Sequence, residues 1–570
     1  MKTANVICLT LFILSGCSHT TKTPEQCSDD RKAIIADSGM VVSAHAESSR
    51  IGIAVMHKGG NAIDAAVATG FALAVCYPEA GNLGGGGFML IRLSDGKTDL
   101  IDYREKAPAK AYDKMFLDNN GNVIEGLSTE SHLAAGVPGS VDGLVNVHSK
   151  YGELPFSEVI QPAIDLARNG FPLKEEQANS LNKNREKFIS RNVSVPPFVS
   201  ELPWKTGDTL RQPLLAETLE RIRDFGRDGF YAGKTARLIV REMERGGGLI
   251  TEEDLINYQS VSREPLYAEY RDYKIITAPP PSGGGIILLQ ILEMIEKYPL
   301  REYGFHSSES VHLMAEAERR AFADRSFYYG DPDFMKVPAD AFLSTDYLSE
   351  RMSSFNHETA SLSSEVTHGD VYRFFNSGSE TTHYSVVDPQ GNAVSATTTL
   401  NGSYGNFIVV DSAGFLLNNE MDDFSIKPGF PNIYGLTGGH TNAVQPGKRM
   451  LSSMTPSIVE EKGKLFIILG SPGGSTIPTS VMQVIVNVID FGMNISDAVN
   501  AGRFHHQWLP DHISFEEGSL PAEVVDKLKN LGHKMMPVKS LGRVNAIMLL
   551  DDGRKASGAD KRGDNAACGY

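Results

Sequence analysis

One stretch of the chain could present a hydroxyl group at the head of a strand: Gly378-Ser379-Glu380-Thr381-Thr382-His383-Tyr384-Ser385-Val386-Val387-Asp388. The segment before it is polar and rich in serine, whereas the residues after Thr382 alternate as in a strand. Threonine favours strands, so a strand that opens on two threonines is ordinary by itself. The stretch gains a chemical meaning only if the chain also supplies the other groups that a threonine nucleophile needs.

A threonine hydroxyl is a weak nucleophile and needs a base within hydrogen-bonding distance. A residue at a new chain terminus supplies its own base, because an α-amine has a pKa of roughly 7.7–8.0 and is partly neutral near neutral pH. Cleavage between Glu380 and Thr381 would create such a terminus, and the Thr381 hydroxyl could itself attack the Glu380 carbonyl. The pattern therefore permits an acyl-transfer enzyme that generates its own nucleophile.

Acyl transfer also needs hydrogen-bond donors for the oxyanion that forms during the reaction. Gly473 and Gly474 lie between a predicted strand at 465–470 and a predicted helix at 478–491. Two glycines there can present unobstructed N–H groups close to a helix N-terminus. Taken alone, the pair is equally compatible with a tight turn.

Composition excludes some classes of function. The chain has 570 residues, a net charge of −16 and 41% hydrophobic residues, which is typical of an ordinary globular protein. Nucleic-acid binding needs clustered lysine and arginine, so the acidic balance argues against it. Many of the 55 glycines lie in short clusters, where backbone must turn tightly or approach other groups closely.

The first residues indicate export. A short basic start and an apolar run at 6–14 precede Leu14-Ser15-Gly16-Cys17, which is typical of a bacterial lipoprotein signal. We expect a signal peptide at 1–16, a lipidated Cys17 and a polar tether at 17–36, with an outer-membrane anchor in a Gram-negative periplasm. An ordinary cleaved signal is the alternative. The mature part has three further cysteines, Cys27, Cys76 and Cys568, which permit at most one disulfide; we expect free or buried thiols.

The order of elements predicts a layered α/β body. Strands are expected at 40–46, 88–93, 100–103, 382–388, 393–400, 407–410, 415–417, 457–460 and 465–470, and helices from 59 towards 76, through much of 155–260, and at 286–295, 311–326 and 478–491. A helix-rich front part thus precedes a strand-rich back part. One α/β/β/α body accounts for this order better than two independent domains.

Several ordered motifs resemble those of γ-glutamyltranspeptidases, also called glutathione hydrolases, which are N-terminal-nucleophile hydrolases. The resemblance covers roughly residues 35–570. It is carried by the motifs at 64–68 (DAAVA), 81–88 (GNLGGGGF), 102–105 (DYRE), 278–284 (APPPSGG), 381–388 (TTHYSVVD), 417–424 (LNNEMDDF), 451–454 (LSSM), 470–475 (GSPGGS) and 503–508 (RFHHQW).

The resemblance implies a role for each matching residue. Thr381 would be both the autoprocessing group and the catalytic nucleophile, and Thr399 would orient it. Gly473 and Gly474 would form the oxyanion hole. The substrate's γ-glutamyl group carries an α-carboxylate and an α-ammonium, for which we expect a cation with hydroxyls at one end and acids at the other. The binding set implied is Arg104, Ser452 and Ser453 for the carboxylate, and Asn401, Glu420 and Asp423 for the ammonium.

Four features need separate comment: two single residues, a loop and a pair of histidines. Glu420 stands where some relatives have Gln, and either can accept from an ammonium. Tyr404 stands where some have Phe, which would add a hydroxyl near the substrate. Residues 428–439 resemble a lid loop. His505 and His506 are interpreted as structural, because adjacent histidines point apart and no third metal ligand is evident.

The resemblance thus implies a four-layer αββα fold, a large subunit (37–380) and a small catalytic subunit (381–570) that remain associated as a heterodimer. The activity implied is transfer of the γ-glutamyl group of glutathione through a γ-glutamyl-Thr381 ester to water, amino acids or peptides, without metal or organic cofactor. Alternatives are a cephalosporin or glutaryl acylase on the same scaffold, disfavoured by Arg104 and Asp423, and a lipoprotein that binds γ-glutamyl compounds without turnover.

Overall fold

The computed structural model of the protein describes residues 26–28, 33–335, 337, 339–369 and 382–570. The predicted signal, the lipidated Cys17 and the junction between Glu380 and Thr381 lie outside these residues. Within the described part, no helix is both long enough and apolar enough to cross a bilayer.

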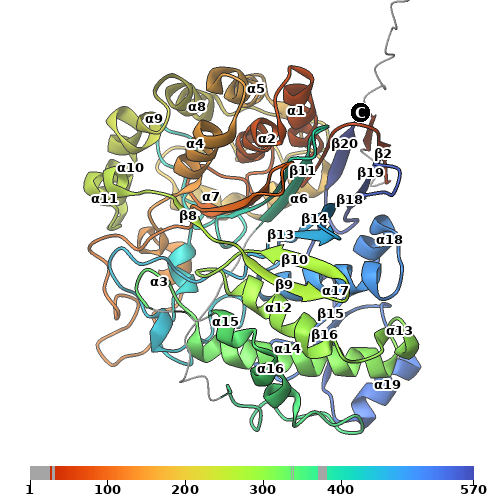
Figure 1. Ribbon diagram of the computed structural model, residues 1–570. Coiled ribbons are helices and arrows are strands. Elements are labelled where there is room, and N and C mark those ends of the chain that lie inside the picture. Colours follow the sequence, from red (N-terminus) through yellow and green to blue (C-terminus); the bar gives the residue numbers. More distant parts are fainter. Residues whose placement is uncertain (1–25, 29–32, 336, 338, 370–381) are drawn as a thin grey trace, which may run out of the picture.

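Two antiparallel sheets form the centre of the molecule (Figure 1). The eight-stranded sheet has the order β1 (Gln26–Ser28), β20 (Ala566–Gly569), β3 (Met40–Ser43), β11 (Thr382–Val387), β12 (Ala393–Thr399), β4 (Gly86–Arg92), β5 (Thr98–Asp102) and β8 (Val261–Arg263). The seven-stranded sheet has the order β2 (Ile35–Ala36), β19 (Lys555–Ala559), β18 (Asn545–Leu549), β14 (Lys464–Gly470), β13 (Ser457–Glu461), β10 (Tyr273–Thr277) and β9 (Leu266–Tyr270). Smaller sheets join β15 (Phe504–His505), β16 (Ile513–Glu516) and β17 (Met535–Val538), and β6 (Phe171–Pro172) and β7 (Thr209–Leu210).

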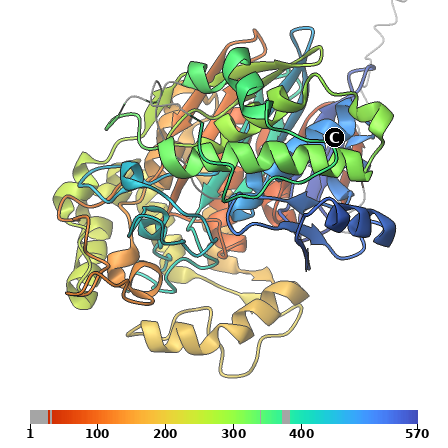
Figure 2. The ribbon, with the colours of Figure 1, turned by 90° about the horizontal axis from the view of Figure 1, so that it is seen from below.

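Helices cover the outer face of each sheet, so the order of layers is αββα (Figures 1 and 2). The helices of the first half are α1 (Ala46–His57), α2 (Ala62–Cys76), α3 (Leu127–Glu130), α4 (Ser140–Tyr151), α5 (Phe156–Asn169), α6 (Glu175–Lys183), α7 (Arg185–Arg191), α8 (Pro213–Phe225), α9 (Asp228–Tyr231), α10 (Gly233–Gly246) and α11 (Glu252–Asn257). The others are α12 (Gly283–Ile295), α13 (Leu300–Tyr303), α14 (Ser308–Tyr328), α15 (Ala339–Phe342), α16 (Thr345–Met352), α17 (Ile477–Ile489), α18 (Ile495–Asn500) and α19 (Ala522–Asn530).

Strand β4 contributes side chains to two hydrophobic cores, one on each face of the eight-stranded sheet. On β4, Met89 and Ile91 pack into the cluster formed with α2 and α5, whereas Phe88 and Leu90 pack into a separate cluster. That second cluster includes Ile458 and other residues of the seven-stranded sheet. Because successive side chains of a strand point to opposite faces, a strand buried on both sides serves two cores at once. The predicted fold class is confirmed.

The two parts of the chain on either side of residue 381 interleave in both sheets. Strand β11 pairs with β3 on one side and with β12 on the other, and β12 pairs in turn with β4. In the seven-stranded sheet, β13 pairs with β10, and β19 with β2. Neither part can therefore complete a sheet alone. This agrees with a single layered body rather than two independent domains.

Several element predictions are confirmed and two are wrong. The hairpins β11–β12 and β13–β14 and the helices α2, α12, α14 and α17 form as expected. Residues 44–46 leave the predicted first strand, and α1, which the sequence did not predict, begins at Ala46. The predicted strands at 407–410 and 415–417 do not form; these residues make only the isolated bridges Val409–Leu416 and Gly84–Leu417. Phe407 and Ser412 have left-handed φ angles of 64° and 61°, which interrupt an extended backbone here.

The expectations for the tether and the cysteines are also corrected. Strands β1 and β2 lie within the predicted tether at 17–36 and belong to the two sheets. Cys27 of β1 forms a disulfide with Cys568 of β20, whereas Cys76 is free and buried. Cysteine spacing could not reveal this pair, because the partners are 541 residues apart and meet only through strand pairing.

Asp388, at the end of β11, should be important for stability. It is fully buried, and its carboxylate accepts hydrogen bonds from the backbone N–H groups of Ala62 and Asn392, both at 2.9 Å. Substituting Asp388 by Ala leaves these donors without an acceptor, and we expect a loss of about 2–4 kcal/mol in unfolding free energy. Denaturant unfolding would measure it.

The matched control is Asp95→Ala. Asp95 accepts from Lys97 N–H at 3.0 Å in the exposed β4–β5 turn, where water can replace it. We expect a change below about 0.5 kcal/mol there. Equal losses in the two variants would contradict the assigned role of Asp388.

Candidate active site

The predicted nucleophile precedes the central strand β11. Thr381 and Glu380 lie outside the described residues, which resume at Thr382. Strand β11 lies between β3 and β12, and its first residue pairs with Thr398. Strand β12 continues one residue beyond that pair to Thr399, which is buried and accepts a hydrogen bond on its hydroxyl from Asn401 N–H at 2.7 Å. Thr399, predicted to orient the nucleophile, is thus held at the end of the hairpin.

Asn82, to which the sequence analysis assigned no role, fixes the backbone of Thr399. Its side-chain Nδ2 donates to the Thr399 carbonyl at 2.7 Å, and its Oδ1 accepts from Gly85 N–H at 2.9 Å and from the Ser140 hydroxyl at 2.7 Å. Asparagine offers both a donor and an acceptor on one rigid group, so it can join two loops to a strand end. Its position beside the glycine cluster was the available signal.

The glycine cluster allows close backbone approach around this strand end. A Cβ at Gly85 would lie 1.9 Å from the Thr399 carbonyl oxygen, and one at Gly84 would lie 2.1 Å from the Leu416 carbonyl oxygen. At Gly86 a Cβ would lie 2.6 Å from a carboxylate oxygen of Glu105. Any side chain here would separate β4 from its neighbours, which is the physical reason for the run of glycines.

Arg104 is the centre of a buried cluster of charges. Its side chain is fully buried, and its two terminal nitrogens contact Glu420 and Asp423 at 2.6 Å each. A third carboxylate, that of Glu105, lies 3.3 Å away. From the sequence we expect the cation and the acids at opposite ends of the site, whereas the structure places them in direct contact. Since the α-carboxylate and α-ammonium of an amino acid share one carbon atom, adjacent opposite charges suit that head group.

Arg104 also connects this cluster with the two predicted serines. Its Nε donates to the Met450 carbonyl at 3.2 Å, and a terminal nitrogen donates to the Leu451 carbonyl at 2.9 Å. Ser452 and Ser453 follow directly. The backbone N–H of Ser452 donates to the Pro281 carbonyl at 2.9 Å, so the proline- and glycine-rich segment at 278–284 supports the serine loop.

Four polar atoms of the predicted binding set are buried without a hydrogen-bond partner among the described residues: Ser453 Oγ, Asn401 Oδ1, and Glu420 Oε1 and Oε2, of which Oε2 forms the ion pair with Arg104. One oxygen of Glu105 is in the same condition. Buried polar atoms are nearly always satisfied, so each such atom calls for an explanation. An α-amino acid would supply the missing partners, because its carboxylate accepts hydrogen bonds and its ammonium donates up to three.

The loop at 428–439, predicted to be a lid, contacts the same cluster. Asn432 donates from Nδ2 to Asp423 at 3.0 Å, and the Tyr434 hydroxyl donates to the Asn401 carbonyl at 2.7 Å. The Ile433 N–H donates to Asp422 at 3.0 Å. The loop therefore lies against the acid-bearing segment, the short 3-10 helix η3 (Glu420–Asp423).

Burial and charge pairing shift the pKa values of the charged cluster in opposite directions. Burial alone would lower the pKa of Arg104, but Glu420, Glu105 and Asp423 outweigh burial and raise it, so the guanidinium stays charged. Burial raises the pKa of Glu105 to about 7, although Arg104 opposes the rise. Burial also raises the pKa of Glu420, against the pull of Arg104. Glu105 and Glu420 therefore ionise less readily near neutral pH than free carboxylates do.

Gly473 and Gly474 lie between β14 and α17, as predicted, and Gly474 opens the short 3-10 helix η5 (Gly474–Thr476). Both have positive φ, 132° and 68°, which favours glycine. A Cβ at Gly473 would lie 2.8 Å from the Cα of Gly542. Neither N–H donates to an acceptor within the described residues, which leaves both groups available for an oxyanion.

Tyr404, whose hydroxyl is expected near the substrate, makes its hydroxyl contacts outside the charge cluster. Its hydroxyl contacts Glu79 at 3.2 Å and Ser180 at 3.1 Å, and its ring packs on Phe188.

The histidine pair is held by protein groups. The ring nitrogens of His505 contact Thr479 Oγ1 at 2.9 Å and Gln507 Oε1 at 3.0 Å, and His506 accepts from Trp508 N–H at 3.1 Å. Burial lowers the pKa of His505 to about 3 and that of His506 to about 4, so both rings stay neutral. These contacts agree with the structural interpretation.

Among the described residues, one group has a composition suited to a metal: His312, Glu316 and His533. The two imidazoles already contact each other at 2.7 Å. Burial raises the pKa of Glu316, but Arg319 and Arg320 outweigh it and lower it to about 2. A carboxylate that is neutralised by two guanidinium groups is a poor metal ligand, so this cluster fits an internal ion-pair network better.

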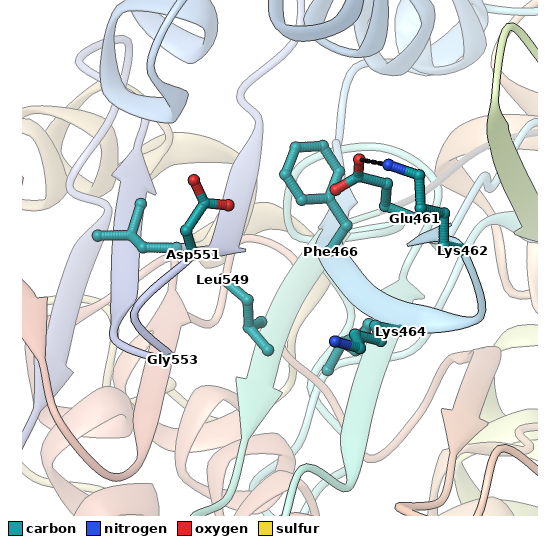
Figure 3. Close-up of a pocket in the computed structure, with 9 residues that line it drawn as sticks. Glu461, Lys462, Lys464, Phe466, Leu549, Asp551 and Gly553 are labelled. Carbon is teal, nitrogen blue, oxygen red and sulfur yellow. Dashed lines mark hydrogen bonds and ion pairs between the residues drawn. The ribbon is translucent and has the colours of Figure 1, made fainter.

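One surface pocket of the described structure, with a volume of about 540 Å³, is lined by none of the predicted site residues (Figure 3). It lies between the β13–β14 turn and the β18–β19 turn and is lined by Glu461, Lys464, Phe466 and Asp551, among others. Glu461 and Lys462 form an exposed ion pair at 3.2 Å there. The predicted site residues thus gather in a buried cluster and not in this surface pocket.

Comparison with known proteins decides the family. The sequence profile of gamma-glutamyltranspeptidases matches residues 48–570. The chain belongs to the gamma-glutamyltranspeptidase family. Glutathione hydrolase proenzymes of Escherichia coli and Pseudomonas aeruginosa are 48% and 43% identical, over 94% and 93% of this chain and 92% and 94% of their own lengths.

Solved structures agree with this membership. Cephalosporin acylase from Bacillus halodurans superposes with a TM-score of 0.81 at 25% identity, covering 98% of this chain and 99% of its own. A chain of Helicobacter pylori gamma-glutamyltranspeptidase has a TM-score of 0.56 at 45% identity, covering 57% of this chain and 94% of its own. The higher sequence identity is thus with the transpeptidase.

We expect Glu105 to lower the unfolding free energy of this family member as pH rises. The native state retains the Glu105 proton up to about pH 7, whereas the unfolded chain releases it near the ordinary value of 4.5. The unfolded state therefore binds fewer protons in this window, so Glu105 lowers the unfolding free energy as pH rises, by up to about 3 kcal/mol. Glu105→Gln cannot ionise and should abolish this contribution.

The measurement is the melting temperature of wild type and variant at about pH 5 and about pH 8. The variant should gain stability relative to wild type at the higher pH only. Glu461→Gln, in the exposed β13–β14 turn, is the control and should leave the difference unchanged. A Glu105→Gln effect of the same size at both pH values would show that Glu105 does not titrate in this range.

Proposed function

We propose that the chain is the precursor of a self-cleaving γ-glutamyltransferase and glutathione hydrolase with Thr381 as nucleophile. The observation that carries the proposal is the direct contact of Arg104 with Glu420 and Asp423. Arg104 and Asp423 are 319 residues apart in sequence, and they meet beside the loop that bears the two serines. Relatives named glutathione hydrolase proenzyme support the activity and the precursor state.

Maturation would begin with an attack of the Thr381 hydroxyl on the Glu380 carbonyl. An ester to Thr381 forms and the amide C–N bond breaks, which frees the Thr381 α-amine. Water then hydrolyses the ester to give the Glu380 carboxylate. The large subunit would span 17–380 after removal of the signal peptide, and the small subunit 381–570. The interleaved sheets would hold the two as a heterodimer, and a Helicobacter pylori chain that matches only 57% of this one supports two separate chains.

Turnover would use the same hydroxyl. The α-amine accepts the hydroxyl proton while Oγ attacks the γ-carbonyl of glutathione, and the departing amine takes up the proton. Gly473 and Gly474 donate to the oxyanion. Arg104, Ser452 and Ser453 bind the α-carboxylate, and Asn401, Glu420 and Asp423 bind the α-ammonium. The γ-glutamyl ester then passes to water, or to the amine of an amino acid or peptide. No step needs a metal or an organic cofactor.

For location, we propose export and attachment to the outer membrane through lipid on Cys17. The support is the sequence pattern of the first 17 residues alone. Several acyl chains on one cysteine would anchor the protein stably, whereas a single chain gives only marginal membrane binding.

Replacing Thr381 by Ala should leave a single uncut chain, because the attacking hydroxyl is gone. Mass spectrometry of purified wild type should find a small subunit that begins at Thr381. Thr381→Ser, which keeps a hydroxyl, should still cleave and is the matched control. Normal cleavage of Thr381→Ala would refute the proposed nucleophile, and absence of turnover by a cleaved wild type would favour a binding protein.

A second candidate function is acylase activity on cephalosporin or glutaryl substrates, favoured by the superposition on cephalosporin acylase and by a Pseudomonas acylase proenzyme that is 35% identical. We expect hydrolysis of a γ-glutamyl anilide to exceed that of a glutaryl anilide, which lacks the α-ammonium. Arg104→Lys should lower kcat/KM for the γ-glutamyl anilide by roughly 30–1000-fold, since lysine cannot bind a carboxylate in bidentate fashion.

The control is Arg92→Lys, which alters a buried arginine that pairs with Glu460 at 2.5 Å outside the site. It should leave the preference between the two anilides unchanged. A wild type that prefers the glutaryl anilide would establish the acylase alternative instead.

A further inference from the structure

The disulfide between Cys27 and Cys568 joins β1, near the start of the sequence, to β20, near its end. Strand β1 pairs with β20 at one edge of the eight-stranded sheet, and Cys27 lies directly opposite Cys568 in the register. Their Cα atoms are 4.2 Å apart, while 541 residues separate them in sequence. Cys568 is fully buried and also pairs with Val41 of β3.

The proposed cleavage site falls between these two cysteines. Cutting after Glu380 assigns Cys27 to the large subunit and Cys568 to the small subunit. We propose that the Cys27–Cys568 disulfide links the two subunits covalently in the mature protein, and so keeps the catalytic subunit attached to the subunit that carries the lipid anchor. This inference rests on the proposed function, since it needs the self-cleavage.

The link lies close to the strand that begins after the cleavage site. In the eight-stranded sheet β20 pairs with β3, and β3 pairs with β11. The C-terminal residue is also held there, because Tyr570 N–H donates to the Gly39 carbonyl at 3.2 Å and its carbonyl accepts from Ser38 N–H at 2.6 Å. Both ends of the covalent bridge are therefore part of the fold that positions β11, not of a loose tail.

A covalent link changes how the two subunits associate. Two chains held only by strand pairing separate on unfolding and must find each other again, at a rate that depends on concentration. A disulfide makes reassociation intramolecular, with an effective concentration set by the short connection. Cys17, the predicted lipid site, lies only ten residues before Cys27. Loss of the catalytic subunit from the membrane would then require reduction as well as unfolding.

Forming the bond requires the removal of two protons and two electrons from the two thiols. A disulfide-bearing oxidant of the exported compartment accepts them by thiol–disulfide exchange and becomes a dithiol. The third mature cysteine does not compete, because Cys76 is fully buried in α2. Burial also raises the pKa of its thiol, which disfavours the reactive thiolate.

The test uses exported, full-length protein whose free thiols are alkylated before denaturation. Without reductant, gel electrophoresis in detergent should give one band of full mature mass; with reductant it should give two bands, the large and the small subunit. Cys27→Ser and Cys568→Ser should give two bands in both lanes, and Cys76→Ser, the matched control, should behave as wild type. Peptide mapping of the unreduced wild type should find Cys27 joined to Cys568.

The outcomes separate this inference from the proposed function. Two wild-type bands without reductant would refute the covalent link and leave self-cleavage intact. One full-length band even after reduction would refute self-cleavage, and with it a link between subunits. As a second readout, membranes from cells that make the lipidated protein are washed with denaturing urea. The small subunit should stay bound in urea alone and be released completely by urea with reductant; release by urea alone would overturn the inference.

Discussion

The buried contact between Arg104 and two carboxylates is the constraint on which the site depends. A fully buried guanidinium is tolerated only where its charge is compensated and its donors are satisfied. Glu420 and Asp423 supply the charge, and the Met450 and Leu451 carbonyls accept the other hydrogen bonds. One side chain thus fixes the end of β5, the η3 helix and the serine loop relative to one another. A substrate with an adjacent carboxylate and ammonium would extend this pattern of charges.

Around this contact, several main-chain segments pack closely against one another. The glycines before β4 allow it to approach β12 and the Glu105 carboxylate, and Asn82 joins the same segment to Thr399. On the other side, the proline- and glycine-rich segment holds Ser452 through backbone hydrogen bonds. The predicted nucleophile directly precedes the same hairpin in sequence. Rigid main-chain contacts therefore position groups that would otherwise lie on independent loops, as precise acyl transfer demands.

The interleaved sheets give cleavage a particular consequence. Strand β11 is bordered on both sides by strands, and β3 and β4 come from the other proposed subunit. A cut before β11 need not disturb the ladder, because the hydrogen bonds of the sheet run between strands and not through the connecting peptide. The disulfide at the sheet edge joins the same two parts at their opposite ends. Both features make the fold of the precursor compatible with that of a two-chain product.

The amino-acid sequence predicts the αββα class, the hairpin that begins at Thr382, most of the buried helices and three residues of the charge cluster, Arg104, Glu420 and Asp423. The hairpin and the helices follow from local periodicity, and the three cluster residues follow from the ordered motifs that resemble the family. It did not reveal α1, where Gly52 weakens the helical pattern; a Cβ there would lie 2.6 Å from Thr69 Oγ1 of α2, so glycine serves packing. Tertiary structure alone decided which way Tyr404 points, that Asn82 supports Thr399, and that Arg104 touches its acids directly. It alone joined Cys27 to Cys568, because a pairing across 541 residues depends on strand register, which no local pattern records.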